Sequence, residues 1–327
     1  MKYRTFGKTN WRVSEVGLGT WALGGGWGNV SESDAKEVLR KAIEEGINFF
    51  DTADVYGDGR SERLIGEVLK ETDKKVYVAT KFGRRLDPHV SSGYTEENLE
   101  RFLDRSLRNL GVETIDLIQL HCPPTDVYYR PEVFETLENF VEEGKVHHYG
   151  VSVEKVEEGL KAIEYPGVVS VQIVFNIFRQ RPSELLFEQC RKKNVAIIAR
   201  VPLASGLLTG KMTPQTKFPK NDHRNYNRQG QFFDIGETFA GVDFETGIRA
   251  VEELKRIKPD GITCAQMALK WILMHHEVSC VIPGAKNLKQ LEENISASGV
   301  EDLSPDVMAG IKTVYENFIK PSVHHRW

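Results

Sequence analysis

The sequence predicts an α/β fold, a (β/α)8 barrel of the TIM type, from the order of its apolar runs. Eight short runs rich in β-branched residues are each followed by a longer segment of helical period. The runs are almost continuously apolar, as expected of parallel strands that are buried on both faces. A chain of 327 residues has the length of one such closed barrel. We therefore expect a single domain over residues 1–327.

The elements follow in order after an N-terminal β-hairpin at residues 1–15, whose turn contains Gly7 and Asn10. Ser31 or Ser33 can cap the first helix, and Thr95 is a typical N-cap of the third. The first expected strand lies in the apolar run of residues 13–23 and ends near Gly19 and Thr20. The other expected strands are residues 47–51, 75–81, 114–121, 145–152, 168–176, 195–203 and 278–284. The expected helices are residues 31–46, 61–71, 95–111, 131–144, 154–164, 183–194, 244–257, 263–275, 287–298 and 304–319.

Two segments interrupt this alternation. Residues 205–241 form a long, mostly polar stretch after the seventh strand, and loops of this length in compact domains are usually functional or disordered. We expect a cofactor and substrate loop there, on the active-site face. The C-terminal helix and tail, residues 304–327, end in "SVHHRW", which either folds back over the barrel rim or frays.

Composition excludes several classes of function. The net charge of -4 gives no electrostatic basis for binding nucleic acid or an anionic membrane. No apolar run approaches the roughly 20 residues of a membrane span, and the N-terminus has no apolar signal core. The four cysteines form no CxxC pair, which is typical of reduced thiols in a cytoplasmic protein. Histidines occur only as adjacent pairs or singly, without metal-ligand spacing, so no metal site is predicted.

The candidate site comes from the carboxyl ends of the strands, where barrels of this type build their active sites. Asp51, Lys81 and His121 end the second, third and fourth expected strands, and Tyr56 follows Asp51 by five residues. Taken singly, these residues are typical of a turn, a surface lysine, a core histidine and loop packing. Their occurrence at three successive junctions on one rim favours an active site. Asp54, equally acidic, has no such partners and is interpreted as a loop or cap residue.

This combination suits proton transfer to an oxygen. A phenol has a pKa of about 10, and a nearby ammonium lowers it. A carboxylate beside the lysine keeps the lysine charged, and a histidine can orient a carbonyl group. These groups fit protonation of a carbonyl oxygen while hydride reaches the carbon. They contain no hydride source, so a cofactor is implied.

The motifs "GLGTW", "FFDTADVYG", "SERLIGEVL", "VATKFG", "LDRSLRNLGVETIDLIQLH", "GVS", "VQIVFN", "PLASGLLTGK" and "VIPGAKNLKQLEEN" occur in this order. Through them the chain resembles the aldo-keto reductase superfamily over nearly its whole length. It looks closest to the bacterial branch of general stress and inositol-operon reductase-like proteins. The resemblance implies a catalytic tetrad of Asp51, Tyr56, Lys81 and His121 and NADPH-dependent reduction of aldehydes and ketones to alcohols.

The resemblance also implies NADP(H) lying extended along the rim. Lys286 would contact the 2'-phosphate, and "PLASGLLTGK" would follow the diphosphate. The implied cofactor-binding residues are Gly19, Thr20, Trp21, Asp51, Ser152, Gln172, Arg200, Pro202, Leu203, Ser205, Gly206, Leu207, Gly210, Lys211, Gly284, Lys286, Gln290, Glu293 and Asn294.

Two positions depart from the family pattern. Val153 occupies the place of an asparagine that holds the nicotinamide amide in the family. Arg200 occupies the place where relatives often stack a tyrosine on the nicotinamide. The arginine could stack there, reach a phosphate or contact the substrate, and these alternatives stay open. Trp21, Trp27 and Tyr94 could line an apolar substrate pocket near the rim.

Two other functions fit parts of the pattern. Some members of this superfamily are cytoplasmic β-subunits of potassium channels, so a redox-sensing interaction protein with little turnover is the alternative. A sugar-phosphate isomerase on the same barrel would bind no nicotinamide cofactor. For the reductase, we expect a small-molecule carbonyl substrate, a cytoplasmic location and a monomer or weak homo-oligomer, with neither nucleic acid nor membrane as partner.

Overall fold

The structure is a computed structural model that describes residues 1–25, 27–28 and 30–327. Its main sheet has eight parallel strands in the order β10-β9-β8-β7-β6-β5-β4-β3. Parallel bridges from Val16 to Val281 and from Gly19 to Gly284 join the two edges, so the sheet closes into the expected barrel. The strands are β3 (Leu18–Gly19), β4 (Phe49–Asp51), β5 (Tyr77–Phe82), β6 (Ile115–His121), β7 (Val146–Ser152), β8 (Val168–Val174), β9 (Ala196–Arg200) and β10 (Val278–Val281).

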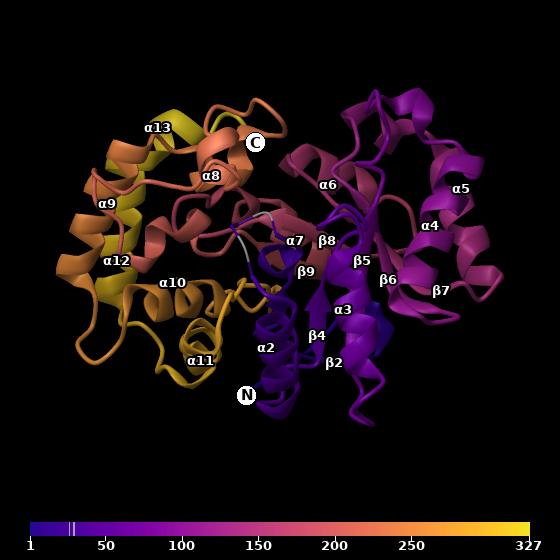
Figure 1. Cartoon of the computed structure of the whole chain (residues 1–327). Helices are drawn as coiled ribbons and strands as arrows, with labels where there is room; N and C mark the ends of the chain where they lie inside the picture. The colour runs from indigo at the N-terminus through magenta and orange to yellow at the C-terminus, as the bar shows by residue number, and fades with distance from the viewer. Residues whose placement is uncertain (26, 29) are drawn as a thin grey trace.

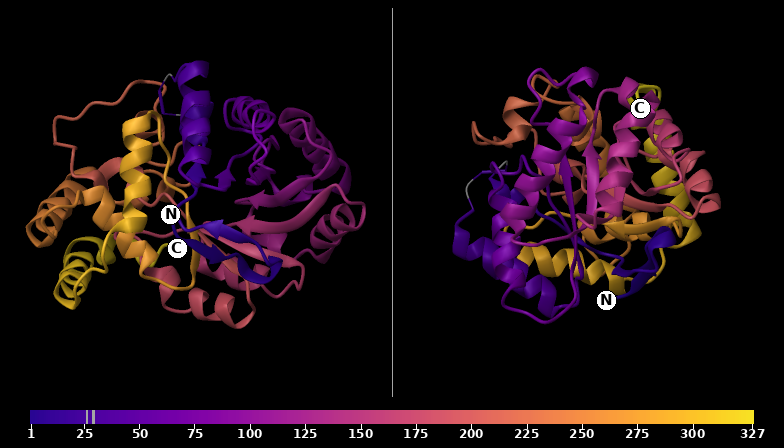
Figure 2. Two further views of the ribbon diagram at one scale, coloured as in Figure 1. Left: turned by 90° about the horizontal axis from the view of Figure 1, so that it is seen from below. Right: turned by 90° about the vertical axis from the view of Figure 1, so that its right-hand side faces the viewer.

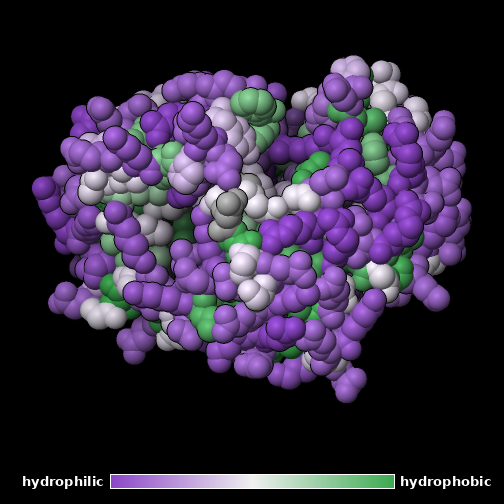
Figure 3. Space-filling view, in the orientation of Figure 1, coloured by the Kyte–Doolittle hydropathy of each residue, from purple (hydrophilic) through white to green (hydrophobic). Residues whose placement is uncertain are grey.

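Helices surround the sheet, and an extended apolar core fills the space between the two layers (Figure 1). Figure 3 shows a mainly hydrophilic surface that is hollowed at the top, between the two halves of the molecule. No helix in the described part of the chain is both long and apolar enough to cross a membrane. The helices are α1 (Trp21–Gly24), α2 (Glu32–Glu44), α3 (Arg60–Leu69), α4 (Glu96–Leu110), α5 (Pro131–Glu142), α6 (Val156–Ala162), α7 (Leu186–Lys192), α8 (His223–Tyr226), α9 (Phe244–Ile257), α10 (Cys264–Leu273), α11 (Leu288–Ser296), α12 (Pro305–Val314) and α13 (Lys320–Val323).

The helix ends confirm several cap assignments. The Ser31 side chain accepts a hydrogen bond from the backbone N–H of Asp34, so Ser31 rather than Ser33 caps α2. Thr95 caps α4 in the same way, through the N–H of Asn98. Gly111 ends α4 in the left-handed conformation, at φ 66°, where glycine lacks the steric penalty of other residues.

The expected hairpin is present as β1 (Tyr3–Thr5) paired antiparallel with β2 (Arg12–Ser14). It lies at the end of the barrel away from the C-terminus (Figures 1 and 2). Phe6 follows β1 and is fully buried against Phe49, Leu117 and Ile198, which point into the barrel from three strands. The hairpin therefore covers the amino-terminal end of the barrel and leaves the carboxyl-end rim free for a site.

The first barrel strand ends near Gly19, as the sequence predicts, but it is shorter than the apolar run that contains it. Only Leu18–Gly19 is assigned as a strand, and Trp21–Gly24 forms the short helix α1 instead of continuing the strand. The Thr20 backbone N–H and hydroxyl both donate to the carbonyl of Asp51, which ends the strand at that residue. The apolar run continues into α1 because that helix is itself buried over the rim.

Of the two interrupting segments, residues 205–241 have only short stretches of helix, whereas residues 304–327 include α12 and α13. Residues 205–241 contain short turns of helix at Ala204–Thr209, His223–Tyr226, Ile235–Glu237 and Phe239–Gly241. The C-terminal tail folds back, since Trp327 is 5% exposed and its indole N–H donates to Asp234. The tail thus packs on the segment that follows the seventh barrel strand.

Candidate active site

Four side chains meet where β4, β5 and β6 end. Lys81 Nζ lies 2.7 Å from Asp51 Oδ1, 2.8 Å from the carbonyl oxygen of Thr52 and 3.4 Å from the Tyr56 hydroxyl. The Tyr56 and His121 rings lie edge to face, with centroids 6.0 Å apart. The structure therefore brings together all four residues of the predicted tetrad. Their assignment to catalysis stays a prediction.

The register of the sheet explains this convergence. Ala79 pairs with Asp51 on one side of β5, and Lys81 pairs with Gln119 on the other. The Asp51 carboxylate also accepts a hydrogen bond from Gln172 Nε2 at 2.7 Å, so both of its oxygens have donors. The Asp51 carboxylate is consequently held in place, because a buried carboxylate needs such partners.

Burial and neighbouring charges set the protonation of the centre. Burial alone would lower the pKa of Lys81, but Asp51 and Tyr56 outweigh it, so this pKa is raised and the ammonium stays charged. Burial lowers the pKa of His121 well below its usual range, with Arg84 and Lys81 adding to the effect. His121 is therefore a neutral imidazole at physiological pH.

The pKa of the Tyr56 hydroxyl differs from the sequence-based expectation, which is a lowered pKa. Burial raises the pKa of the Tyr56 hydroxyl, and the charge of Lys81 opposes the shift without reversing it. The phenol thus keeps its proton at neutral pH. A group that must donate a proton needs this state, and the lysine stabilises the phenolate that remains after donation.

A cleft of about 370 Å³ opens beside these residues. Tyr56 and His121 line it, whereas Lys81 is fully buried behind them. Of the residues implied for cofactor binding, the cleft is lined by Gly19, Thr20, Trp21, Asp51, Ser152, Gln172, Arg200, Pro202, Leu203, Ser205, Gly206, Lys211, Gly284, Lys286, Gln290, Glu293 and Asn294.

Some candidate residues lie away from the described cleft walls. Leu207 is buried beneath the turn at Ala204–Thr209, and Gly210 ends that turn with its Cα facing Cys264.

Tyr94, expected near the substrate, is buried, and its hydroxyl bonds to His89 at 2.8 Å. Trp27 does line the cleft, in an edge-to-face contact with Trp21.

The turn after β9 has an unusual backbone. Val201, Ala204 and Ser205 have φ values of 53°, 47° and 55°, and Gly206 has φ 96°. Left-handed conformations are costly for non-glycine residues and cluster at functional sites. Successive residues of this kind can turn their N–H groups toward one anion, as in a phosphate-binding nest. The geometry fits the diphosphate position implied for "PLASGLLTGK".

Two cationic side chains, Lys286 and Arg224, line the cleft. Burial lowers the pKa of the Lys286 ammonium, and Arg224 adds to this effect because it lies close by. Lys286 Nζ also donates to the carbonyl of Trp27. Arg224 is held by the Asp222 carboxylate through Nε at 2.9 Å and Nη2 at 2.6 Å. The sequence analysis missed Arg224, although "NDHRNYNRQG" offered its basic residues as a signal.

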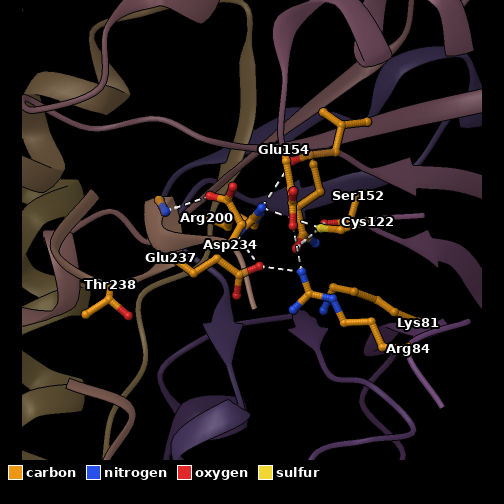
Figure 4. A network of polar contacts seen from close by, with 12 residues as sticks. Lys81, Arg84, Cys122, Ser152, Glu154, Arg200, Asp234, Glu237 and Thr238 are labelled. Carbon is orange, nitrogen blue, oxygen red and sulfur yellow. Dashed lines mark hydrogen bonds and ion pairs between the residues drawn. The ribbon is translucent and has the colours of Figure 1, made fainter. Parts of the chain in front are cut away.

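A polar network includes the cleft-lining residues Arg200 and Glu237 (Figure 4). Arg84 contacts Glu237 at 2.6 Å and Glu154 at 3.1 Å. Arg200 lies 3.5 Å from the same Glu237 oxygen and donates to the carbonyl of Val153 at 3.1 Å. Val153 thus holds Arg200 through its backbone carbonyl, which the valine side chain does not affect. Sequence reasoning missed Arg84 and Glu237, since neither lies at the end of a strand.

Cys122 Sγ and the carboxylates of Glu154 and Glu237 have ligand atoms within 4.8 Å of one another. This is a possible metal geometry that the sequence spacing did not predict. Two arginines already occupy the surroundings of these atoms, and their charges disfavour an additional cation. Burial raises the pKa of the Cys122 thiol to about 11, so the thiolate that a metal requires is disfavoured as well.

The fold and the site together define a (β/α)8-barrel protein in which Asp51, Lys81, Tyr56 and His121 meet at the rim beside a cleft. The sequence matches the model of the Aldo/keto reductase family over residues 15–316. This chain therefore belongs to the aldo/keto reductase family, a family of oxidoreductases.

Individual relatives agree over nearly the full length. The chain is 29% identical to the aldo-keto reductase YhdN of Bacillus subtilis, covering 99% of this chain and 96% of the relative. It is 30% identical to the aldo-keto reductase yakc [NADP(+)] of Schizosaccharomyces pombe, covering 93% and 89%. The solved aldo-keto reductase AKR11C1 of Bacillus halodurans in its holo form is 25% identical, with a TM-score of 0.77 and 96% of each chain covered.

Proposed function

We propose that this protein reduces aldehydes and ketones to alcohols with NADPH. The observation that carries the proposal is the buried chain of contacts from Asp51 through Lys81 to the Tyr56 hydroxyl, at 2.7 and 3.4 Å, on the wall of the cleft. In this proposal, Tyr56 donates the proton to the carbonyl oxygen. Lys81 stabilises the resulting phenolate, Asp51 fixes Lys81, and neutral His121 orients the carbonyl.

The residues of the cleft fit a phosphorylated dinucleotide. Lys286 and Arg224 supply positive charge where a 2'-phosphate would lie, and the left-handed turn at Val201–Gly206 suits a diphosphate. Ser152 and Gln172 lie near Asp51, where an amide could be held. When bound, NADPH supplies the hydride for the carbonyl carbon. The NADP(+) named for the fission yeast relative supports this choice.

The test is NADPH oxidation by the purified full chain with small aldehydes, ketones, methylglyoxal and sugars. Tyr56→Phe should lower kcat at saturating NADPH by at least about 100-fold, since positioned proton donors contribute that much. NADPH affinity, measured by fluorescence titration, should change little. Tyr129→Phe is the matched control, because Tyr129 is 64% exposed.

Each alternative predicts a different result. Near wild-type rates in the Tyr56→Phe variant would show that another group donates the proton. NADPH binding without turnover on any carbonyl would favour a redox-sensing interaction protein like a channel β-subunit. Absence of NADPH binding would favour an isomerase. Faster oxidation of NADH than of NADPH would contradict the role given to Lys286.

A further inference from the structure

Glu237 is a buried carboxylate on the cleft wall that the tetrad does not use. Only 8% of its side chain is exposed, and it belongs to the lining of the cleft together with Tyr56 and His121. It comes from the short helical turn Ile235–Glu237 of the polar segment after β9. The hydroxyl of Ser205 donates to its backbone carbonyl at 3.0 Å, which fixes this turn against the left-handed loop.

One of the two Glu237 carboxylate oxygens has a hydrogen-bond donor, and the other has none in the described part of the chain. Oε1 accepts a hydrogen bond from Arg84 at 2.6 Å and lies 3.5 Å from Arg200. Oε2 receives no hydrogen bond from any residue that the structure describes. Glu237 lines the cleft, so Oε2 is the carboxylate oxygen that remains to accept a hydrogen bond from a ligand bound there.

The charge state of Glu237 determines what the ligand must offer. Burial alone would raise its pKa, but Arg84 and then Arg200 outweigh burial and lower the pKa to about 2. The group is therefore ionised at physiological pH and can only accept hydrogen bonds. The ligand must bring an O–H or N–H donor, and an anionic group facing Oε2 would be repelled.

The surroundings favour a neutral donor. The cations Lys81, Arg84 and Arg200 are already paired with carboxylates at the catalytic end, so the described residues leave no unpaired charge there to attract a charged substrate. A Glu237 carboxylate oxygen lies within 4.8 Å of the Sγ of Cys122, the residue that follows His121, so this carboxylate is close to the catalytic end. A donor that reaches Oε2 while its carbonyl faces Tyr56 thus belongs on a carbon near that carbonyl.

We propose that Glu237 is a specificity-determining residue that accepts a hydrogen bond from a substrate hydroxyl, so that the site prefers hydroxylated aldehydes and ketones to carbonyls on plain hydrocarbon chains. The inference rests on the proposed reductase function and adds the substrate class to it. Arg84 is a positioning residue in this arrangement, because it holds Oε1 and leaves Oε2 available to a ligand.

The experiment compares glyceraldehyde with propanal, which has the same chain length without hydroxyl groups. In Glu237→Gln, kcat/KM for glyceraldehyde should fall about tenfold more than kcat/KM for propanal, since one hydrogen bond to a charged acceptor is worth that factor or more. Glu154→Gln is the matched control. Glu154 contacts the same arginine at 3.1 Å but does not belong to the described lining of the cleft, so this ratio should stay within about twofold.

The remaining outcomes separate the two proposals. Equal losses on both substrates, or weaker NADPH binding by Glu237→Gln, would overturn the specificity role and leave the reductase function standing. A wild-type protein that reduces neither substrate would overturn both. If Glu237→Gln fails to fold, inhibition of the wild-type enzyme with NADP+ bound decides the matter. Propane-1,2-diol should then bind about tenfold more tightly than propan-1-ol, and equal binding would contradict the inference.

Discussion

At the scale of single residues, burial acts differently on two neighbouring side chains of one loop. Tyr56 gains a lysine partner and a place on the cleft wall. Asp54 is fully buried, and neither of its oxygens has a hydrogen-bond partner in the described part of the chain. Burial and then the charge of Glu62 raise the pKa of Asp54 from 3.8 to about 7. The interpretation of Asp54 as a simple loop or cap residue is therefore incomplete.

This shift predicts a pH dependence of stability. The folded chain binds the Asp54 proton more tightly than the unfolded chain does, so this contribution is full below about pH 4 and is lost as the pH rises through about 7. Asp54→Asn cannot ionise and should escape the loss. Relative to wild type, its free energy of unfolding should increase by up to about 4 kcal/mol between pH 4 and pH 8, from about three pKa units at 1.36 kcal/mol each.

Urea denaturation at the two pH values measures this difference. Asp58→Asn is the control, because hydrogen bonds from Arg85 and Arg105 lower the pKa of exposed Asp58. Its contribution is present above its unfolded pKa and is lost as the pH falls, so the control should show a small effect of the opposite sign. A pH-independent difference between wild type and Asp54→Asn would contradict a proton held on Asp54.

At the scale of elements, the helix α1 supports the loop that carries the tyrosine. A Cβ added at Gly24, inside α1, would lie 2.8 Å from the backbone carbon of Tyr56. Backbone atoms cannot yield as the end of a flexible side chain can. The close approach of α1 and the Tyr56 loop thus requires glycine at this position.

Gly24→Ala should therefore push α1 and the loop apart. We expect a loss of about 1–3 kcal/mol in the free energy of unfolding, as for other overpacked sites, together with a lower kcat. Thermal denaturation and carbonyl reduction measure the two effects. Gly299→Ala is the control, since no atom lies within 4 Å of the added Cβ and Gly299 has no left-handed φ. Unchanged stability and kcat in Gly24→Ala would show that the contact has no role in placing Tyr56.

Sequence patterns predicted those elements whose signals are local. Apolar runs located all eight barrel strands, and Thr95 and Gly111 marked the ends of α4, because caps depend on a few adjacent residues. The ends of β4, β5 and β6 also predicted that Asp51, Lys81 and His121 lie together, because the carboxyl ends of parallel barrel strands meet at one rim. Glu237 escaped prediction because it lies in a segment without periodicity and reaches Arg84 across 153 positions of sequence. The net pKa of Tyr56 also depends on burial, which a sequence motif does not report.

At the scale of the whole molecule, the C-terminal Trp327 contacts the segment that carries Glu237. The Trp327 indole N–H donates to Asp234 Oδ2 at 3.1 Å, and the guanidinium of buried Arg179 lies 3.5 Å above the indole ring. Arg179 in turn donates to the carbonyl of Ala240 at 2.9 Å. Asp234 and Ala240 lie on either side of Glu237 in the sequence. Trp327 therefore supports both ends of the turn that carries Glu237, directly through Asp234 and indirectly through Arg179.

Removing the contacts of Trp327 should loosen residues 211–241. Trp327→Ala leaves a cavity beside Arg179, and large-to-small changes of a buried tryptophan cost about 3–5 kcal/mol. We expect lower thermal stability and faster proteolysis within residues 211–241. Phe232→Ala is the control, because Phe232 lies in the same segment but is 73% exposed. If Glu237 depends on these contacts, kcat/KM should fall more for glyceraldehyde than for propanal. Faster proteolysis without that change in selectivity would mean that Arg84 and Arg200 hold Glu237 without help from the tail.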